Sequence, residues 1–278
     1  DVQFDDYGNV VTWDGGPIRI AGGDNPDAVA SNSVLQRMVV EPVTAFLAAL
    51  ESNVIATSEV ALEGRRDPGI RTEETNLGNL MADSILYAAN LNAADFGMPE
   101  ADVALQNGGG IRNNTLIPAG DITELNTFEI APFSNFVSIV PDIPREQFKQ
   151  ILENAYSSAP DANGRFAQIA GMTVEYDPNA TPMDIDDETG EILVEGTLDD
   201  GTVIVDGGAV VAGDDITIAT IDFLANGGDE YPFMGAPFTR VGVVYQQALF
   251  NYIVDGLGGL ISAADYPEGG EGRIVQLP

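Results

Sequence analysis

The chain has 278 residues, and its 44 Asp or Glu against 11 Lys or Arg give a formal net charge of −33. It contains no His and no Cys, which excludes a Ser-His-Asp triad, a cysteine nucleophile, a zinc site with nitrogen or sulfur ligands and a His- or Cys-ligated haem within these residues. A metal held by this chain alone would need oxygen ligands. The negative charge repels nucleic acids and anionic membranes, so we expect no nucleic-acid partner.

The composition also indicates where the protein works. Lys149 is the only lysine, and an acidic surface almost free of lysine suits high salt, where charge repulsion is screened. The absence of cysteine fits a secreted bacterial protein, so we expect a periplasmic or extracellular, salt-adapted location. Uninterrupted apolar runs are much shorter than the roughly 20 residues of a membrane span, so no span is expected.

The first part of the chain, residues 1–24, is rich in glycine and turn residues and has no apolar pattern that would form a core. A short strand is expected there at residues 17–20. Apolar residues at helical spacing then predict a helix over residues 33–51, with a kink or a restart at Pro42. A lead of this kind suits the tail of a preceding domain.

The remaining elements alternate between helix and strand. Helical periodicity predicts helices over 77–89, where Asn76 would be the cap, over 144–156 and over 241–254. Strands are expected at 54–62, 103–105, 136–140, 166–176 and 216–221. The acidic residues 177–214 predict a hairpin with long turns, and the stretch 184–190 departs from a calcium loop because its glycine falls one place late. Since no regular β-α-β period emerges, the predicted fold class is α+β, a mixed sheet with packed helices.

Two short motifs combine glycine or a helix start with arginine. Three glycines and Arg112 follow Asn107 at the end of a short strand, where glycine permits a close backbone approach and arginine can clamp an anion. Arg71 stands just ahead of a predicted helix N-terminus, a position that favours anions. Taken alone, each motif also fits an ordinary turn, cap or surface ion pair.

Two aromatic residues occupy loops next to predicted strands. Phe133 follows Pro132 ahead of the strand at 136–140, and such a residue is commonly a core side chain. Phe223 precedes an Asn-Gly-Gly-Asp sequence that ends at Asp229. This turn can present a ring and a carboxylate on one side, although a plain β-turn also explains it.

Together these segments resemble the C-terminal domain of bacterial and animal 5′-nucleotidases, a family that includes UDP-sugar hydrolases and 2′,3′-cyclic phosphodiesterases. The order and spacing of the motifs agree over residues 55–255. The matching segments are Arg71 with 74–80, 107–112, 120–122, 132–135, 152–153 with 166–171, and 223–229. The resemblance implies that residues 1–54 are the end of a catalytic domain and an interdomain helix, and that residues 55–278 are a nucleotide-recognition domain.

The resemblance also implies a partner domain and its metals. Members of this family hydrolyse nucleotide phosphoesters on an N-terminal metallophosphatase domain that carries two divalent metals. This chain has no His and no Asp-x-His or Gly-Asn-His-Glu motif. We therefore expect no cofactor in these residues, and we expect the chain alone to be inactive.

A substrate site follows from the same resemblance. The base of an AMP-like nucleotide or nucleoside would lie between two rings, with polar groups around its edge, its ribose and its phosphate. The implied roles are base stacking for Phe133 and Phe223, the base edge for Asn107, the ribose for Asp229, phosphate for Arg71 and Arg112, and a close backbone approach for Gly110.

Two points remain open in the sequence. The family commonly has glycine where Glu230 stands, so a turn that needs positive φ would be strained there and the ribose role of Asp229 would be affected. The chain could instead be a stand-alone nucleotide- or nucleoside-binding module, or a dimerisation module. In the last case it would form a homodimer, and Phe133 and Phe223 would be core or interface residues.

Overall fold

A computed structural model describes residues 1–184 and 190–278, so most of the acidic stretch 184–190 lies outside the described residues. The chain divides into two compact units, Asp1–Ala48 and Ala49–Pro278. The division lies inside helix α2 (Glu41–Ser52), ahead of the boundary expected after residue 54.

The first unit contains little regular structure before its helix. Strands β1 (Val2–Phe4) and β2 (Val10–Trp13) pair as an antiparallel hairpin, whereas the strand expected at residues 17–20 does not form. Helix α1 (Ser33–Leu35) continues through a π-helical turn at residues 36–40 into α2, so the predicted helix over 33–51 forms, with an irregular turn ahead of Pro42 and no restart at that residue.

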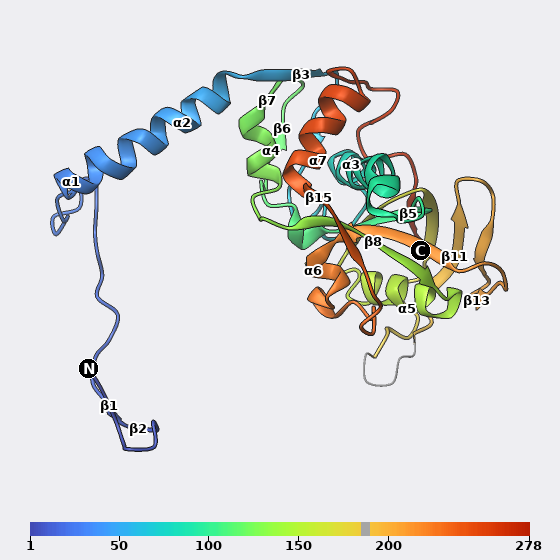
Figure 1. Ribbon diagram of the computed structural model, residues 1–278, viewed down its shortest axis with the longest axis horizontal. Helices are drawn as coiled ribbons and strands as arrows, with labels where there is room; N and C mark the ends of the chain where they lie inside the picture. The colour runs from blue at the N-terminus through green and yellow to red at the C-terminus, as the bar shows by residue number, and fades with distance from the viewer. Residues whose placement is uncertain (185–189) are drawn as a thin grey trace. The chain divides into compact units, whose positions relative to one another are not determined.

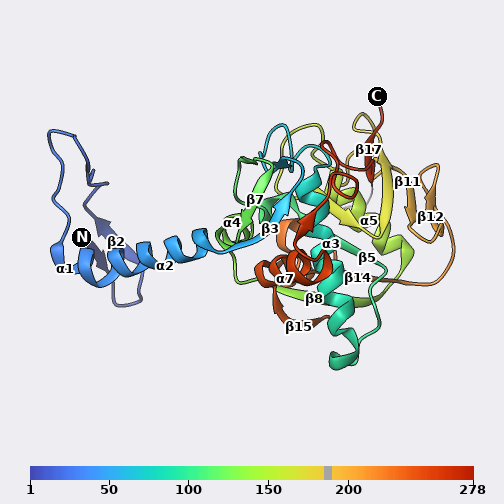
Figure 2. The same cartoon turned by 90° about the horizontal axis from the view of Figure 1, so that it is seen from above.

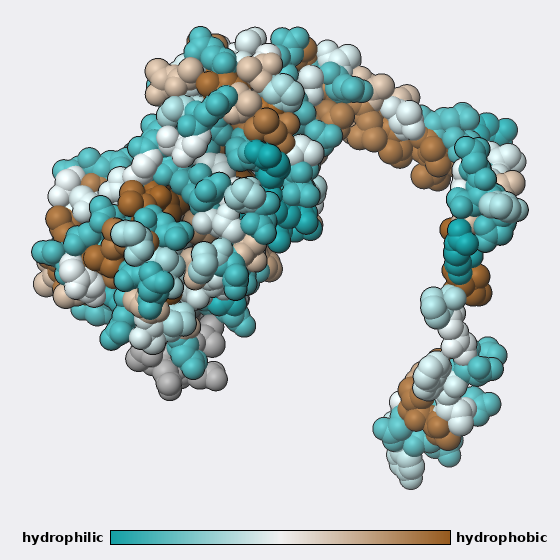
Figure 3. Space-filling model, turned by 180° about the vertical axis from the view of Figure 1, so that it is seen from behind, coloured by the Kyte–Doolittle hydropathy of each residue, from teal (hydrophilic) through white to brown (hydrophobic). Residues whose placement is uncertain are grey.

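Almost the whole first unit is exposed. Ala21 is the only buried residue among residues 1–48, all of which the structure describes. Trp13 is 73% exposed and Phe46 is 62% exposed. Figure 3 shows hydrophobic residues along the surface of helix α2. This unit therefore has no hydrophobic core of its own.

One helical segment also meets the length and hydropathy of a membrane span. Residues Ser33–Ser52 form 20 helical residues with a mean hydropathy of 1.3, and only 6% of that window is buried. Pro42 and the charges of Arg37 and Glu41 interrupt its apolar residues, and charges are costly at the centre of a bilayer. The expectation that no segment spans a membrane rested on uninterrupted apolar runs, and it stays a prediction.

The second unit is organised around a central mixed sheet (Figure 1). Strands β14 and β5 are parallel, and every other neighbouring pair in this sheet is antiparallel. In spatial order the strands are β15 (Thr239–Val244), β8 (Phe136–Ile143), β14 (Ile216–Ile221), β5 (Val103–Asn107) and β9 (Ala167–Ala170). Helix α3 (Asn76–Ala93) packs along this sheet, with α7 (Tyr245–Asn251) beside it (Figure 2).

A second sheet is formed by β13, β12, β11, β10 and β17, and α5 packs against it. The strand expected at 166–176 is two strands, because Gly171 adopts a φ of +81° and ends β9 before β10 begins. The bounds are β10 (Met172–Tyr176), β11 (Leu193–Leu198), β12 (Val203–Asp206), β13 (Ala209–Val210), β17 (Ile274–Gln276) and α5 (Arg145–Tyr156).

Short elements complete the unit. Two small sheets contain β3 with β7 and β16, and β4 with β6. The bounds are β3 (Val54–Ser58), β4 (Leu62–Glu63), β6 (Leu116–Ile117), β7 (Gly120–Thr123), α4 (Glu124–Ile130), α6 (Asp222–Ala225) and β16 (Leu260–Ile261). The α+β fold with a mixed sheet is thus confirmed.

Two further local predictions are wrong. The helix expected at 241–254 begins only at Tyr245, because the β-branched residues before it extend β15 and pair with β8. Asn76 does not cap α3, since Thr75 accepts the hydrogen bond from the Gly78 amide over 3.0 Å. The Asn76 side chain is buried instead and donates to the carbonyl of Ala61 over 2.8 Å.

Candidate functional site

A cavity of about 620 Å³ opens at one edge of the central sheet. Strands β5 and β14 run parallel, so their carboxyl ends meet at this edge together with the loops that follow them. The seven residues predicted for the site all line this cavity: Arg71, Asn107, Gly110, Arg112, Phe133, Phe223 and Asp229. Gly109, Ser134, Asn135, Gly164 and Ile221 complete the lining.

The two rings in the cavity are half exposed. Phe133 is 45% exposed and Phe223 is 43% exposed, whereas most large apolar residues of this unit are buried. The exposure removes the alternative that these rings are core residues. The Phe223 ring lies against Gly228, where an added Cβ would come within 2.5 Å of ring atoms, so a side chain at this position would displace the ring.

Polar side chains hold the backbone of the loop that carries Phe133 at two points. The Tyr245 hydroxyl accepts from the Phe133 amide over 3.1 Å and donates to the Gly110 carbonyl over 3.2 Å. Asp222, next to Phe223, accepts from the Phe136 amide over 3.1 Å. These contacts tie the loop that carries Phe133 to the glycine run and to the start of α6.

Tyr245 is a site-supporting residue that the sequence did not reveal, because its position fell inside an expected helix. Its side chain is fully buried. Burial raises the pKa of the Tyr245 hydroxyl to about 12, although the Phe133 amide and the Arg112 charge act in the opposite direction. The hydroxyl therefore stays protonated and able to donate at neutral pH.

Polar side chains link the ends of β5 and of the turn after α6. Asn107, which is buried, donates from Nδ2 to Asp229 Oδ2 over 2.5 Å. Gln106 donates from Nε2 to Asn107 Oδ1 over 3.0 Å, so both ends of the Asn107 amide are oriented. Gly110 makes room for this arrangement, since a Cβ there would meet the Gln106 and Asn107 side chains.

The arginines of the cavity form a positive cluster in an otherwise acidic chain. Burial lowers the pKa of the Arg71 guanidinium, and the like charges of Arg66 and Arg112 lower it further. Arg71 Nε is buried and has no hydrogen-bond partner in the described part of the chain. Arg112 donates to the Gly109 carbonyl over 3.2 Å, and its guanidinium lies 5.5 Å from the Phe133 ring centre. An anion at this end of the cavity would meet several donors and offset their mutual repulsion.

Arg66 is a second residue that the sequence analysis missed. It precedes the cis Asp67-Pro68 bond, and nothing in its local pattern distinguishes it from the neighbouring Arg65. The positive charge of Arg66 repels that of Arg71 and lowers its pKa, whereas Arg65 forms an ion pair with Glu63. Only the folded arrangement separates the two arginines.

A buried glutamine holds the loop that carries Arg71. Gln168, on β9, donates from Nε2 to the carbonyls of Ile70 over 3.2 Å and Glu73 over 2.8 Å, and its Oε1 accepts from the Thr75 amide over 3.2 Å. These bonds flank Arg71 and the start of α3. The glutamine of the matching segment 166–171 therefore holds the backbone on both sides of Arg71.

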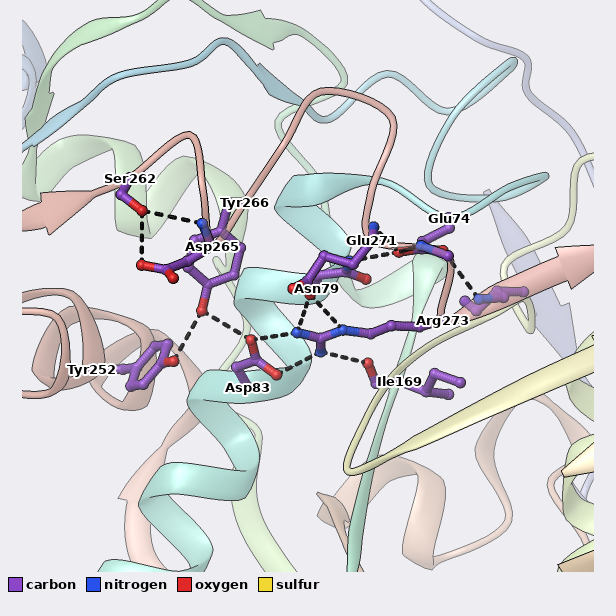
Figure 4. Close-up of polar contacts among 12 residues, drawn as sticks. Glu74, Asn79, Asp83, Ile169, Tyr252, Ser262, Asp265, Tyr266, Glu271 and Arg273 are labelled. Atoms are coloured by element: carbon purple, nitrogen blue, oxygen red, sulfur yellow. Dashed lines mark hydrogen bonds and ion pairs between the residues drawn. The ribbon is translucent and has the colours of Figure 1, made fainter. Parts of the chain in front are cut away.

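Glu74, an acidic residue of the Arg71 motif, binds groups of the protein itself. The Glu74 carboxylate accepts from the amides of Glu271 over 2.6 Å and Ile274 over 3.0 Å and from Asn79 Nδ2 over 2.7 Å, as Figure 4 shows. Arg273 pairs with Asp83 of α3 over 2.6 Å in the same view. These contacts fasten the C-terminal segment to α3, so Glu74 is engaged within the protein. No group of three or more Asp or Glu residues is arranged to hold a metal ion in the described ranges 1–184 and 190–278.

Comparisons with known proteins identify the family of this chain. A family model described as 5′-nucleotidase, C-terminal domain, matches residues 54–236. The trifunctional nucleotide phosphoesterase protein YfkN of Bacillus subtilis is 31% identical over 235 residues, which cover 83% of this chain and 14% of that protein. The snake venom 5′-nucleotidase of Macrovipera lebetinus is 27% identical over 188 residues, which cover 65% of this chain and 43% of that protein.

A solved structure shares the fold. The crystal structure of the 5′-nucleotidase precursor from Thermus thermophilus aligns with a TM-score of 0.68 and 26% identity, over 99% of this chain and 48% of that one. The chain thus spans about half the length of that relative, and a smaller part of the two proteins above.

Proposed function

Because the chain belongs to the 5′-nucleotidase C-terminal domain family, we propose that its second unit recognises a nucleotide or nucleoside in the cavity lined by Phe133 and Phe223. This proposal is carried by one observation: two half-exposed rings lie in a cavity that is also lined by Arg71 and Arg112 and by the hydrogen-bonded pair Asn107 and Asp229. A flat base stacked between two rings fits such a cavity, and stacking tolerates different bases because each has a π-face.

The polar groups suggest how the rest of the ligand is held. Asn107 Nδ2 has a second hydrogen besides the one directed at Asp229, so it can donate to an acceptor on the base edge. The Asp229 carboxylate can accept from ribose hydroxyls. Arg71 and Arg112, supported by the charge of Arg66, would contact the phosphate, while Gly110 leaves the cavity wall free of a side chain at that point.

We further propose that catalysis belongs to a preceding metallophosphatase domain with two divalent metals. The residues present do not fit such a site, because the chain has no His and its described part has no metal-binding carboxylate group. The exposed apolar side chains of residues 1–48 are the kind of surface that a preceding domain would cover. Residues 1–54 would then be the end of that domain and the helix that joins it to the recognition domain.

The location follows from composition and from one relative. An acidic chain without cysteine and a relative from snake venom support a periplasmic or extracellular protein, and the near absence of lysine supports salt adaptation. The nucleotide would then be met outside the cytoplasm.

Calorimetric titration of the purified chain with adenosine, AMP and ribose 5-phosphate tests the proposal. We expect adenosine and AMP to bind in the micromolar to millimolar range and ribose 5-phosphate to bind more weakly, since it lacks the base. Binding of ribose 5-phosphate as tight as that of AMP, or no binding of adenosine, would contradict recognition of the base.

A further inference from the structure

The turn that carries Asp229 is strained. Asp229 has a φ of +52° and Glu230 has a φ of +61°. They are the only two consecutive non-glycine residues with positive φ in the part of the chain that the structure describes. Residues other than glycine disfavour this region, so two in succession require surrounding contacts that hold them there.

Arg165 supplies those contacts. Its guanidinium forms an ion pair with the Glu230 carboxylate and donates to Asn154 Oδ1 over 3.1 Å. Asn154 in turn donates from Nδ2 to the Asp229 carbonyl over 3.2 Å. The Tyr231 hydroxyl donates to the carbonyl of Arg165 over 2.6 Å. The backbone of Arg165 therefore contacts Tyr231, and its side chain contacts Glu230 directly and Asp229 through Asn154.

We propose that Arg165 and Glu230 are positioning residues that hold the Asp229 carboxylate against Asn107 and toward the cavity, and that they thereby set the strength of ribose recognition. This inference rests on the proposed function. Without the ion pair, relaxation of Glu230 to negative φ would rotate the turn and carry the Asp229 side chain away from Asn107 Nδ2. The side chain of Arg165 is 22% exposed and that of Glu230 is 58% exposed, so the pair lies on the solvent side of the turn, outside the residues that line the cavity.

The test compares a ribose-dependent and a ribose-independent ligand. Adenosine and 2′,3′-dideoxyadenosine are titrated into the unaltered chain and into Glu230→Gln, Arg165→Met and Glu230→Gly. Glu230→Gln keeps the side-chain shape but removes the charge, and we expect adenosine to bind about two- to five-fold more weakly. Arg165→Met also removes the contact with Asn154, and we expect a loss of about ten-fold. The affinity for dideoxyadenosine should stay unchanged in both.

Glu230→Gly is the rescue variant. Glycine adopts positive φ without strain, so adenosine should bind to this variant within about two-fold of the unaltered chain although the ion pair is gone. Glu63→Gln is the matched control, because Glu63 also pairs with an arginine but does not line the cavity. It should leave both affinities unchanged.

The outcomes separate this inference from the proposed function. Equal weakening of adenosine and dideoxyadenosine, or unchanged adenosine binding in both Glu230→Gln and Arg165→Met, would overturn the positioning role while base recognition stands. A loss in Glu230→Gly as large as that in Glu230→Gln would also overturn it. Failure of the unaltered chain to bind adenosine would contradict the proposed function itself, and the positioning role with it.

Discussion

Asn107 Nδ2 donates to Asp229 Oδ2 over 2.5 Å, although 122 positions separate the two residues in the chain. The contact joins the end of β5 to the turn that follows α6, and both segments line the same cavity. A carboxylate oriented by a buried amide is a preorganised acceptor, because it requires no rearrangement when a hydroxyl ligand arrives.

Removal of the Asp229 carboxylate should abolish discrimination for the ribose hydroxyls. We expect Asp229→Ala to weaken adenosine binding by about 1.5–3 kcal/mol and to leave dideoxyadenosine binding nearly unchanged, since a hydrogen bond to a charged group is worth this amount. Titration calorimetry with both ligands measures the difference. If the two affinities fall together, Asp229 is not the ribose acceptor.

Removal of either ring should weaken the base contact. We expect Phe133→Ala and Phe223→Ala each to reduce the binding free energy of adenosine by about 1–3 kcal/mol, the range measured for base–aromatic stacking. Phe96→Ala is the control, because Phe96 is 44% exposed, much like the two rings, but does not line the cavity. Unchanged affinity in both ring variants would argue against stacking.

The arginine cluster should distinguish AMP from adenosine. We expect AMP to bind more tightly than adenosine, and Arg112→Gln to reduce that advantage by about 1.5–3 kcal/mol, because it removes a charge-assisted contact to phosphate. Arg65→Gln removes the same charge from an arginine that does not line the cavity, and it should preserve the advantage. An advantage that is equal in the Arg112 variant and the unaltered chain would exclude phosphate binding by Arg112.

The residues that line the cavity could be picked out from the sequence because their motifs are local. The strand that ends at Asn107 with its glycine run, the loop with Phe133 and the turn with Asp229 each carry a sequence signature, and the fold brings them to one sheet edge. The supporting residues were not predictable in this way. Tyr245 and Arg165 act through contacts to segments far away in the chain, and no local pattern records such contacts.

The fold shows the same division. Periodicity located α3 and β14, because burial of one helix face or of a whole strand leaves a regular apolar pattern. The start of α7 was missed because valines before Tyr245 suit a strand and a helix face alike, and pairing with β8 decides between them. Strain at Glu230 could be suspected from the absent glycine, but its partner Arg165 is visible only in the folded chain.

Tyr245 should make stability depend on pH in the alkaline range. Burial raises its folded-state pKa to about 12 from the ordinary value of 10.0, so its contribution is complete below pH 10 and is lost as pH rises toward 12. Tyr245→Phe abolishes this alkaline loss of stability, which is worth about 1.4 kcal/mol per pKa unit. The same substitution also removes the hydrogen bonds to the Phe133 amide and the Gly110 carbonyl.

Urea unfolding at about pH 8 and about pH 11 measures the effect. We expect the unaltered chain to be more stable than Tyr245→Phe at the lower pH and the difference between the two to shrink at the higher pH. Other buried tyrosines titrate equally in both proteins and cancel in the comparison. A difference that is constant between the two pH values would contradict the raised pKa.

The net charge of −33 should make the folded chain depend on salt. Repulsion among exposed carboxylates is screened over about 10 Å at 0.1 M salt and about 3 Å at 1 M. We therefore expect the thermal unfolding midpoint to rise from low salt to molar salt. Circular dichroism measures this midpoint. A thermal unfolding midpoint that stays constant or falls from low to molar salt would contradict salt adaptation.

The most direct measurement of nucleotide recognition is a crystal structure of the chain grown with adenosine. We expect the purine ring between the side chains of Phe133 and Phe223, with the ribose hydroxyls at Asp229 and the base edge at Asn107. Density for adenosine outside the cavity, or inside it with the base in contact with neither ring, would contradict nucleotide recognition by these residues.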